Sequence, residues 1–372
     1  MKILCSLSTC FSPSFQDQTT HQGRESEATF RIFTHSELKS ATRSFDSSNK
    51  IGEGGFGTVY KGRLRDGTFV AVKVLSIELD SLRGEKEFVA ELGTLGDIKH
   101  QNLVTLRGCC VEGAHRYLVY EYMENNSLHR YFLGSQEGRM RFSWESRREV
   151  AIGVARGLAY LHEEIKPHVV HRDIKARNIL LDQNLRPKVS DFGLAKLLRD
   201  DKSYVSTQVA GTLGYLAPEY ASSGKVTRKS DVYSYGILLL QIVSGLPVVD
   251  PYQDKQRFLV EKAWAAYEAG DLTKMVDAEL NEESVAEEEE SIRFLKVGLL
   301  CTQETAKLRP RMSEVVEMLS NKIEMLNVSI SKPGLVPDLR AIRTRNAPHS
   351  EVSTSSAAAH ASSIWSSSNL AR

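Results

Sequence analysis

The spacing of apolar residues is strand-like in the first part of the chain. The runs 58–62 and 69–75 are rich in β-branched residues, and the Asp66-Gly67 pair between them is a hairpin signal. Two more strands are expected at 103–106 and 117–120. Between 85 and 96 the period changes to that of a helix. The apolar residues of this helical stripe are Phe88, Val89, Leu92 and Leu95.

After Met123 the pattern becomes helical. Ser143 can cap a helix that continues to Leu161. A nearly all-apolar helix is expected between 226 and 244, and a helix of that composition belongs in a core. Amphipathic helices are expected at 291–301 and 313–326. The acidic run 287–290 is interpreted as a solvated helix start, where negative charge is favoured.

These changes predict an α+β protein with two lobes. We expect a flexible leader at 1–44, in which only Phe33–Leu38 is structured, because Thr34 and Glu37 form a capping-box pattern. A small antiparallel β-rich lobe with one main helix should follow at 45–123, and a larger helical lobe at 124–326. The Ser-rich stretch 327–372 is expected to be disordered.

Composition narrows the function classes. The 372 residues are 41% hydrophobic and 26% charged with a net charge of +1, so no global field favours nucleic acid or an anionic membrane. The five cysteines show no metal-ligand or disulfide-framework spacing. No apolar run approaches the roughly 18 residues of a spanning helix. We expect a cytoplasmic protein, with lipid on Cys5 and Cys10 at the inner face of the plasma membrane as the alternative.

A glycine-rich loop lies at 52–59, directly after Ile51 and inside the strand-rich part. Glycines let backbone amides approach phosphate oxygens closely. A dinucleotide-binding fold also uses such glycines, but there a helix must follow them, whereas Thr58 and Val59 are β-branched. We therefore expect a phosphate-binding hairpin. Its residues are Ile51, Gly52, Glu53, Gly54, Gly55, Phe56, Gly57 and Val59.

Lys73 stands among apolar residues of the predicted strand 69–75. A lysine there is unfavourable unless it is paired. The expected partner is Glu91 in the helix 85–96, and Glu87 is the alternative. Strand alternation places the small Ala71 on the same face as Lys73, which leaves room for a flat ring.

Polar residues crowd into the stretch 171–178, directly before an apolar run. In this loop Asp173 could orient a hydroxyl and Lys175 could offset phosphoryl charge. Asn178 and Asp191 offer hard oxygen ligands for Mg²⁺. Gly193 should allow a sharp turn behind Asp191. Taken singly, residues 171–178 could be a salt-bridged surface loop, and residues 191–193 could be an ordinary turn.

The order of these motifs along the chain decides between the alternatives left open for each of them. Glycine loop, strand lysine, helix glutamate, His171-Arg172-Asp173 with Asn178, Asp191-Phe192-Gly193 and Ala217-Pro218-Glu219 follow one another along the chain. This order resembles the signature of eukaryotic protein kinases over roughly 46–322. Lys175, two positions after Asp173, resembles the pattern of the serine/threonine class. The segment Phe33…Phe45 and Tyr120 resemble the corresponding residues of plant receptor-like cytoplasmic kinases. Within that group, the chain resembles the cold-responsive type.

The resemblance implies transfer of the ATP γ-phosphoryl group to Ser or Thr of protein substrates, with Mg²⁺ or alternatively Mn²⁺. It implies that Lys73 and Glu91 hold the α/β-phosphates. Adenine should meet the backbone from Glu121 to Met123, between Val59, Ala71 and Leu180. His171 and Phe192 should stack with Leu95 and Leu106. Structural roles are implied for Glu219 paired with Arg309 and for Asp231 on the loop backbone.

Arg172 beside Asp173 predicts control by phosphorylation, because a cation there needs an anion partner. The candidate acceptors are Ser203, Ser206 and Thr207, whereas Thr212 is expected to contact Asp173 and the substrate. Membrane receptor kinase complexes are the implied upstream partners. A pseudokinase-like scaffold or binding module is the alternative function, although every catalytic position holds the expected residue type.

Overall fold

The computed structural model describes residues 30–54, 57–76, 81–133, 142–250, 252, 258–280, 285–325 and 328–336. Two compact units divide them. One contains the residues up to His100 together with Val104–Met123, and the other contains Gln101–Leu103 and the chain from Glu124 onward. The expectations for Cys5, Cys10, Gly55 and Phe56 lie outside the described residues. Each unit is described by itself.

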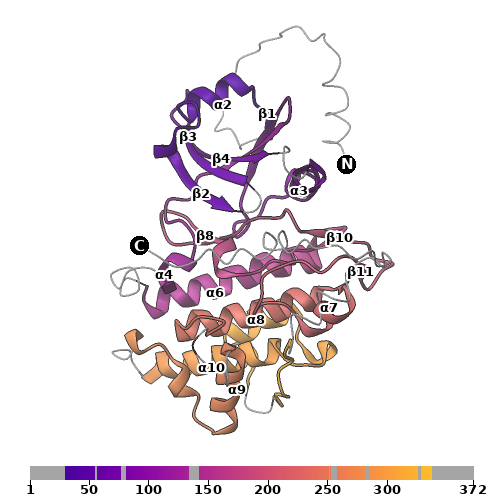
Figure 1. Cartoon of the computed structure of the whole chain (residues 1–372). Coiled ribbons are helices and arrows are strands. Elements are labelled where there is room, and N and C mark those ends of the chain that lie inside the picture. Colours follow the sequence, from indigo (N-terminus) through magenta and orange to yellow (C-terminus); the bar gives the residue numbers. More distant parts are fainter. Residues whose placement is uncertain are drawn as a thin grey trace, which may run out of the picture. The chain divides into compact units, whose positions relative to one another are not determined.

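A six-stranded sheet forms the first unit (Figure 1), in the order β1-β5-β6-β4-β3-β2. Its strands are β1 (Arg31–Ile32), β2 (Lys50–Gly54), β3 (Gly57–Arg63), β4 (Phe69–Ser76), β5 (Leu106–Glu112) and β6 (His115–Glu121). All neighbours are antiparallel except β1 and β5. The predicted hairpin is confirmed: Asp66 Oδ1 accepts from Thr68 N at 2.8 Å, and Gly67 has φ 88°.

The strand expected at 103–106 is wrong. Leu103 makes only an isolated bridge to Val189, and the strand begins at Leu106 and continues to Glu112. The two-residue strand β1, too short to see in an apolar pattern, lies against Gly108 of this strand. A Cβ on Gly108 would come 1.9 Å from the Arg31 carbonyl oxygen, so glycine is required for this approach.

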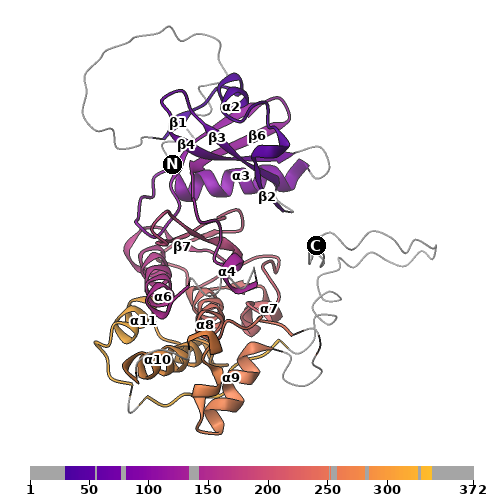
Figure 2. The ribbon, with the colours of Figure 1, turned by 90° about the vertical axis from the view of Figure 1, so that its left-hand side faces the viewer.

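Helix α3 (Ser81–Leu95) packs beside the sheet, as Figure 2 shows. It begins earlier than the pattern indicated. Phe88, Leu92 and Leu95 are buried, but Val89 is exposed, so Val89 does not belong to the apolar stripe. Position 89 lies outside the i, i+4, i+7 series of the other three, which explains its orientation.

A short helix precedes the sheet. α2 (His35–Ala41) starts at the predicted cap, where Thr34 Oγ1 accepts from Glu37 N at 3.2 Å. Leu38 and Phe33 are buried in a cluster with residues of the sheet, Val70, Val72, Tyr117 and Val119 among them. The structured part of the leader therefore extends from Arg31 to Ala41, beyond the predicted Phe33–Leu38.

Helices build the second unit. They are α4 (His129–Leu133), α6 (Trp144–Ala159), α7 (Pro218–Ser223), α8 (Arg228–Ser244), α9 (Leu259–Glu268), α10 (Val285–Cys301) and α11 (Met312–Leu319). In Figure 1, α6, α8 and α10 lie in succession. Every residue of α8 from Ser230 to Ser244 is buried, which confirms the predicted core helix. Ser143 caps α6, accepting from Ser146 N at 3.4 Å, and a π-helical turn (Tyr160–Glu164) follows.

Short strand pairs carry the connections between these helices. They are β7 (His168–Val170) with β10 (Lys196–Leu198), β8 (Ile179–Leu181) with β9 (Pro187–Val189), and β11 (Val205–Ser206) with β12 (Lys225–Val226). Across the described part of the chain, no helix combines the length and the apolar content that crossing a membrane requires.

Two expectations for the second unit need correction. α11 ends at Leu319 rather than 326, because Asn321 takes a left-handed conformation (φ 57°) that stops the helix. Residues 328–336 are not a disordered tail, since they pack on the unit through Ile330 and Pro333, so the boundary at 327 is wrong. In the acidic run, Glu290 is partnered rather than solvated, accepting from Trp144 Nε1 at 2.9 Å.

Candidate functional site

The 171–178 loop joins β7 to β8, and one buried carboxylate from α8 holds its backbone. Asp231 accepts from His171 N at 2.7 Å and from Arg172 N at 2.8 Å. His162 Nε2 lies 3.0 Å from the same carboxylate. Burial raises the pKa of Asp231, but His162, His171 and the Arg172 amide together bring this pKa below its usual value. The loop is therefore fixed to a charged group in the core.

Asp173 lies at the centre of a polar cluster in this loop, with only 4% of its surface exposed. Its Oδ2 is 2.7 Å from Lys175 Nζ, and its Oδ1 accepts from Thr212 Oγ1 at 2.8 Å. Lys175 also donates to Thr212 Oγ1 at 2.9 Å. Asn178 Nδ2 donates to both the backbone carbonyl (2.9 Å) and Oδ2 (3.1 Å) of Asp173. The carboxylate is thus oriented by neutral and cationic donors, and Thr212 Oγ1 marks where a hydroxyl can approach it.

Asn178 and Asp191 come from the two neighbouring ends of the β8–β9 pair. Ser190 connects them, because its backbone N and its Oγ both donate to the Asn178 carbonyl at 2.9 and 3.0 Å. The expected turn lies at Gly193, where Ala195 N donates to the Phe192 carbonyl at 2.9 Å, and Asp191 before it has φ 67°. A carboxylate strained in this way is typical of a functional position. Phe192 is buried, and its ring contacts that of His171 edge-on at 4.7 Å.

This donor set fits magnesium. Carboxylate and amide oxygens are hard ligands, and Mg²⁺ usually takes one or two carboxylates and completes its shell with water and phosphate. Among the described residues no group of three or more His, Cys, Asp and Glu side chains could form a metal site by itself. A site built from Asn178 and Asp191 would therefore depend on a bound phosphate for its remaining ligands.

In the first unit, Lys73 on β4 and Glu91 on α3 form the expected ion pair, with Nζ 2.6 Å from Oε1. Glu91 is fully buried, and the Tyr120 hydroxyl on β6 hydrogen-bonds its other oxygen. This tyrosine contact was not expected. Since a buried carboxylate needs several donors, the pair is held by three elements of the unit.

The glycine-rich hairpin consists of β2 and β3, which confirms that strands surround the glycines. Gly52 pairs with Val59, Glu53 with Thr58, and Gly54 with Gly57. Gly57 has φ 130°, and a Cβ there would meet the Val74 carbonyl oxygen at 2.1 Å, so no other residue fits. Ile51 is exposed and Val59 is half-buried.

The residues expected to meet adenine lie on β3, β4 and β8, and at and after the end of β6. Ala71 alternates with Lys73 along β4 and pairs with Tyr120. The Glu121 carboxylate accepts from Thr105 N at 2.7 Å, and Met123 is buried. In the second unit, Leu180 on β8 is half-buried.

Arg172 is satisfied by neutral acceptors. Its guanidinium donates to the Tyr220 hydroxyl (2.6 and 3.2 Å) and to the carbonyls of Leu194 and Gln208, each at 2.8 Å. It also lies over the Tyr220 ring, 5.5 Å from the centroid. In this structure carbonyl and phenol oxygens meet its donors, rather than an anion. Tyr220 follows the Ala-Pro-Glu motif, and its aromatic hydroxyl was the only sequence signal for this role.

The candidate phosphate acceptors lie on the segment before Tyr220. Ser203 and Ser206 are exposed, and Thr207 is half-buried. Ser206 on β11 pairs with Lys225 on β12, and Thr207 N donates to the Gly224 carbonyl at 3.0 Å. Ser206 therefore offers an accessible hydroxyl beside a cation.

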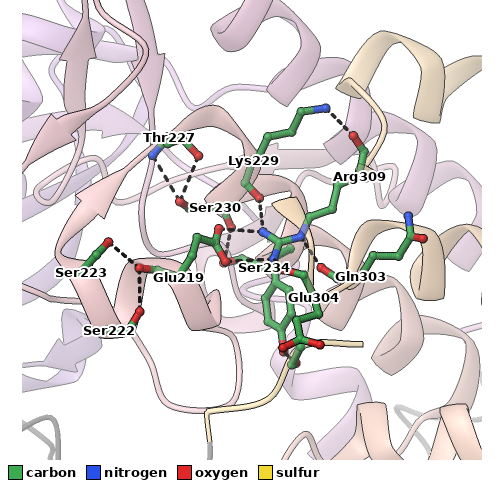
Figure 3. A network of polar contacts seen from close by, with 12 residues as sticks. Glu219, Ser222, Ser223, Thr227, Lys229, Ser230, Ser234, Gln303, Glu304 and Arg309 are labelled. Carbon is green, nitrogen blue, oxygen red and sulfur yellow. Dashed lines mark hydrogen bonds and ion pairs between the residues drawn. The ribbon is translucent and has the colours of Figure 1, made fainter. Parts of the chain in front are cut away.

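Glu219 and Arg309 form the expected brace, with two parallel contacts of 2.7 and 2.9 Å (Figure 3). Arg309 is buried and also donates to three backbone carbonyls, those of Gln303 (2.7 Å), Lys229 (3.0 Å) and Glu304 (3.3 Å). A bidentate pair of this kind is geometrically specific. It ties the start of α7 to the turn after α10.

The chain is similar to known proteins over most of its length. Residues 45–319 match the family model described as the protein kinase domain. Cold-responsive protein kinase 1 of Arabidopsis thaliana is 51% identical over 318 residues, which cover 85% of this chain and 80% of that protein. A serine/threonine-protein kinase of Helianthus annuus is 58% identical over 242 residues, 64% of this chain and 100% of that protein.

A third relative is larger. A probable LRR receptor-like serine/threonine-protein kinase of Arabidopsis thaliana is 53% identical over 309 residues. These residues cover 83% of this chain but only 29% of that receptor-like protein. The similarity therefore concerns one part of the larger relative.

Proposed function

Because the chain belongs to the protein kinase family and is a serine/threonine protein kinase, we propose that Asp173 orients the acceptor hydroxyl during transfer of the ATP γ-phosphoryl group. The observation that supports this role is the cluster of Lys175, Thr212 and Asn178 around the Asp173 carboxylate. The hydroxyl oxygen attacks the γ-phosphorus in line, the bond to the β-phosphate oxygen breaks, and Asp173 accepts the proton late in the transfer. ADP and a phosphoester are the products.

Lys175 stabilises the charge on the transferred group. Its ammonium is 2.7 Å from Asp173, so it can follow negative charge from the carboxylate to the phosphoryl oxygens. Thr212 keeps the Asp173 carboxylate and the Lys175 ammonium in place, and it contacts the Ser or Thr residue that accepts the phosphoryl group. Lys175 is also the position that indicates serine/threonine preference.

Nucleotide binding is assigned to residues of each unit. Lys73, held by Glu91, grips the α/β-phosphates, and the backbone amides of the glycine-rich hairpin cover them. The backbone from Glu121 to Met123 receives the adenine, with apolar contacts from Val59, Ala71 and Leu180. A protein kinase domain implies ATP and a divalent metal.

Asn178 and Asp191 would hold that metal, which supplies charge neutralisation on the β- and γ-phosphates when bound. Asp191→Ala should lower the affinity for Mg-ATP at least about tenfold, because it removes the only carboxylate assigned to the metal. Calorimetric titration with a non-hydrolysable ATP analogue, with and without Mg²⁺, measures this. Equal magnesium dependence in wild type and variant would refute the assignment.

Phosphorylation of the segment before Tyr220 is proposed to regulate the enzyme. Ser206, opposite Lys225, is the preferred acceptor, with Ser203 and Thr207 as alternatives. Since Arg172 already has neutral partners, the phosphate would act by ordering β11 against β12. Ser206→Ala with Thr207→Ala should lower activity several-fold. Unchanged activity of the wild type after phosphatase treatment would contradict this.

The cellular setting is proposed from the relatives. We infer plant signalling downstream of membrane receptor kinases, in the cytoplasm and without nucleic acid, with lipid on Cys5 and Cys10 at the inner face of the plasma membrane as the alternative. Imaging of a fluorescent fusion tests the anchor: Cys5→Ser with Cys10→Ser should release it from the membrane. An unchanged distribution would rule out the lipid. We propose kinase lobes at 45–123 and from 124 onward, with residues 328–336 belonging to the second lobe rather than to a tail.

A further inference from the structure

Residues 328–336 cross the turn that follows α10, and we call them the 328–336 strap. Glu304 N donates to the Lys332 carbonyl at 3.1 Å, and Gly334 N donates to the Thr302 carbonyl at 3.0 Å. The Gln303 side chain accepts from both Ser331 N (3.0 Å) and Ser331 Oγ (2.8 Å) through one oxygen. Four hydrogen bonds therefore attach the strap to only three residues of the turn.

The strap also reaches α8 and the start of α7. The buried Tyr233 hydroxyl donates to the Gly334 carbonyl at 2.7 Å. Gly334 lies so close to Pro218 that a Cβ on it would come 2.8 Å from Pro218 Cγ and 3.1 Å from Glu304 Cα. Glycine is required here by contact, and the contact is with the residue directly before Glu219.

The turn under the strap is the one that Arg309 binds. The Arg309 guanidinium donates to the Gln303 and Glu304 carbonyls while it pairs with Glu219 (Figure 3). It also lies over the Tyr233 ring, 5.0 Å from the centroid. Strap and brace thus hold the same short piece of backbone, from two sides, through Gln303 and Glu304.

The end of the strap lies beside the segment that carries Thr212. Leu335 and Val336 line a small cavity together with Leu213, Gly214 and Leu216. Gly214 has φ 87°, and Tyr215 N donates to the Thr212 carbonyl at 3.1 Å, so this segment is a tight turn. Apolar contact from the strap therefore supports the turn that presents Thr212 to Asp173.

We propose that the 328–336 strap helps to position the acceptor protein. The strap holds residues 212–218 in the geometry that lets Thr212 and Asp173 meet the acceptor hydroxyl. This inference rests on the proposed roles of Asp173 and Thr212. The strap acts at both ends of that segment, through Pro218 and through Leu213–Leu216. Nucleotide binding, assigned to other residues, does not depend on it.

Truncation gives the first test. A chain that ends at residue 336 should keep the KM for an acceptor peptide within about twofold, whereas a chain that ends at 327 should raise it about tenfold, because several hydrogen bonds are lost. The KM for ATP should stay the same in both. An unchanged peptide KM after removal of the strap, or an equal rise in both KM values, would overturn the proposal.

Point variants test it where the shorter chain fails to fold. Ser331→Asp removes the hydroxyl donor and places a carboxylate against the Gln303 oxygen, so it should raise the peptide KM. Ser331→Thr keeps the hydroxyl and should behave as the wild type. Ser329→Asp adds the same charge at an exposed position two residues away and serves as the matched control. Equal peptide KM values for Ser331→Asp and Ser329→Asp would contradict the proposal.

The Asp173→Ala variant distinguishes a failure of the strap proposal from a failure of the proposed function. If that variant loses transfer while Ser331→Asp leaves the peptide KM unchanged, the strap proposal fails and the proposed function stands. If Asp173→Ala retains transfer, the proposed function itself is wrong.

Discussion

At the scale of single residues, the site depends on polar side chains that satisfy one another. Asp173, Lys175 and Thr212 form a closed triangle of contacts between 2.7 and 2.9 Å. Arg172 is completed in the same way by Tyr220. The triangle could be predicted, because motif order identifies its members. The Tyr220 contact could not, since a buried guanidinium can donate to any oxygen and a sequence does not say which one folds onto it.

We predict that Tyr220→Phe lowers kcat about tenfold with little change in the KM for ATP. The change removes two acceptor contacts of Arg172 and the acceptor of Ala210 N (2.9 Å), each a net contribution of about 1 kcal/mol. Steady-state kinetics measures it. Tyr204→Phe is the matched control, because Tyr204 is exposed on the same segment. Equal kcat values for the two variants would contradict this role.

At the scale of elements, α8 combines several tasks. Asp231 holds the 171–178 loop, Tyr233 holds the 328–336 strap, and Ser234 Oγ donates to the Tyr215 carbonyl at 2.7 Å. Its apolar composition predicted burial correctly. The polar positions within it were predictable only at Asp231, because the targets of Tyr233 and Ser234 come from distant parts of the chain.

Helix α4 carries a pH-sensitive residue. Burial, together with the Arg177 charge, lowers the pKa of His129 to about 4. The unfolded chain binds a proton near pH 6.5, whereas the folded chain stays neutral, so stability is complete above pH 6.5 and is lost as the pH falls towards 4. Because the ring is partly exposed, solvent screening reduces the effect to about 1–2 kcal/mol.

Lowering the pH from 7.5 to 5 should reduce the unfolding free energy of the wild type. We predict that this reduction is about 1 kcal/mol smaller in His129→Gln. Urea denaturation at both pH values measures the difference. Arg177→Gln should raise the pKa of His129 and weaken this pH dependence, because it removes the neighbouring positive charge. Parallel pH profiles for wild type and His129→Gln would exclude His129 as the source.

At the scale of the whole molecule, the fold extends past the segment that carries the family resemblance at both ends. Upstream, β1 and α2 complete the sheet and its apolar cluster. Downstream, the strap packs on the second unit. Lobe order, hairpins and the long helices could be predicted, because strong periodicity and turn residues encode them. Helix α2 could be predicted from its capping box, but β1 and the strap could not, since a two-residue strand and an irregular strap have no period.

We predict that Phe33→Ala lowers the unfolding free energy by about 3–5 kcal/mol, because it opens a cavity in the cluster beneath α2. Chemical denaturation measures it. Ile32→Ala, at a neighbouring residue that is 47% exposed, is the control and should cost well under half as much. Similar losses for both variants would mean that the segment is not part of the core.

The proposed reaction requires that Asp173 orients and deprotonates the acceptor hydroxyl. Transfer of labelled phosphate from Mg-ATP to a serine- or threonine-containing substrate should be compared for the wild type and Asp173→Ala, with ATP affinity measured on both proteins. We predict a loss of about 10²–10⁴-fold in transfer at unchanged ATP affinity. Equal transfer by the two proteins would show that Asp173 does not have this role.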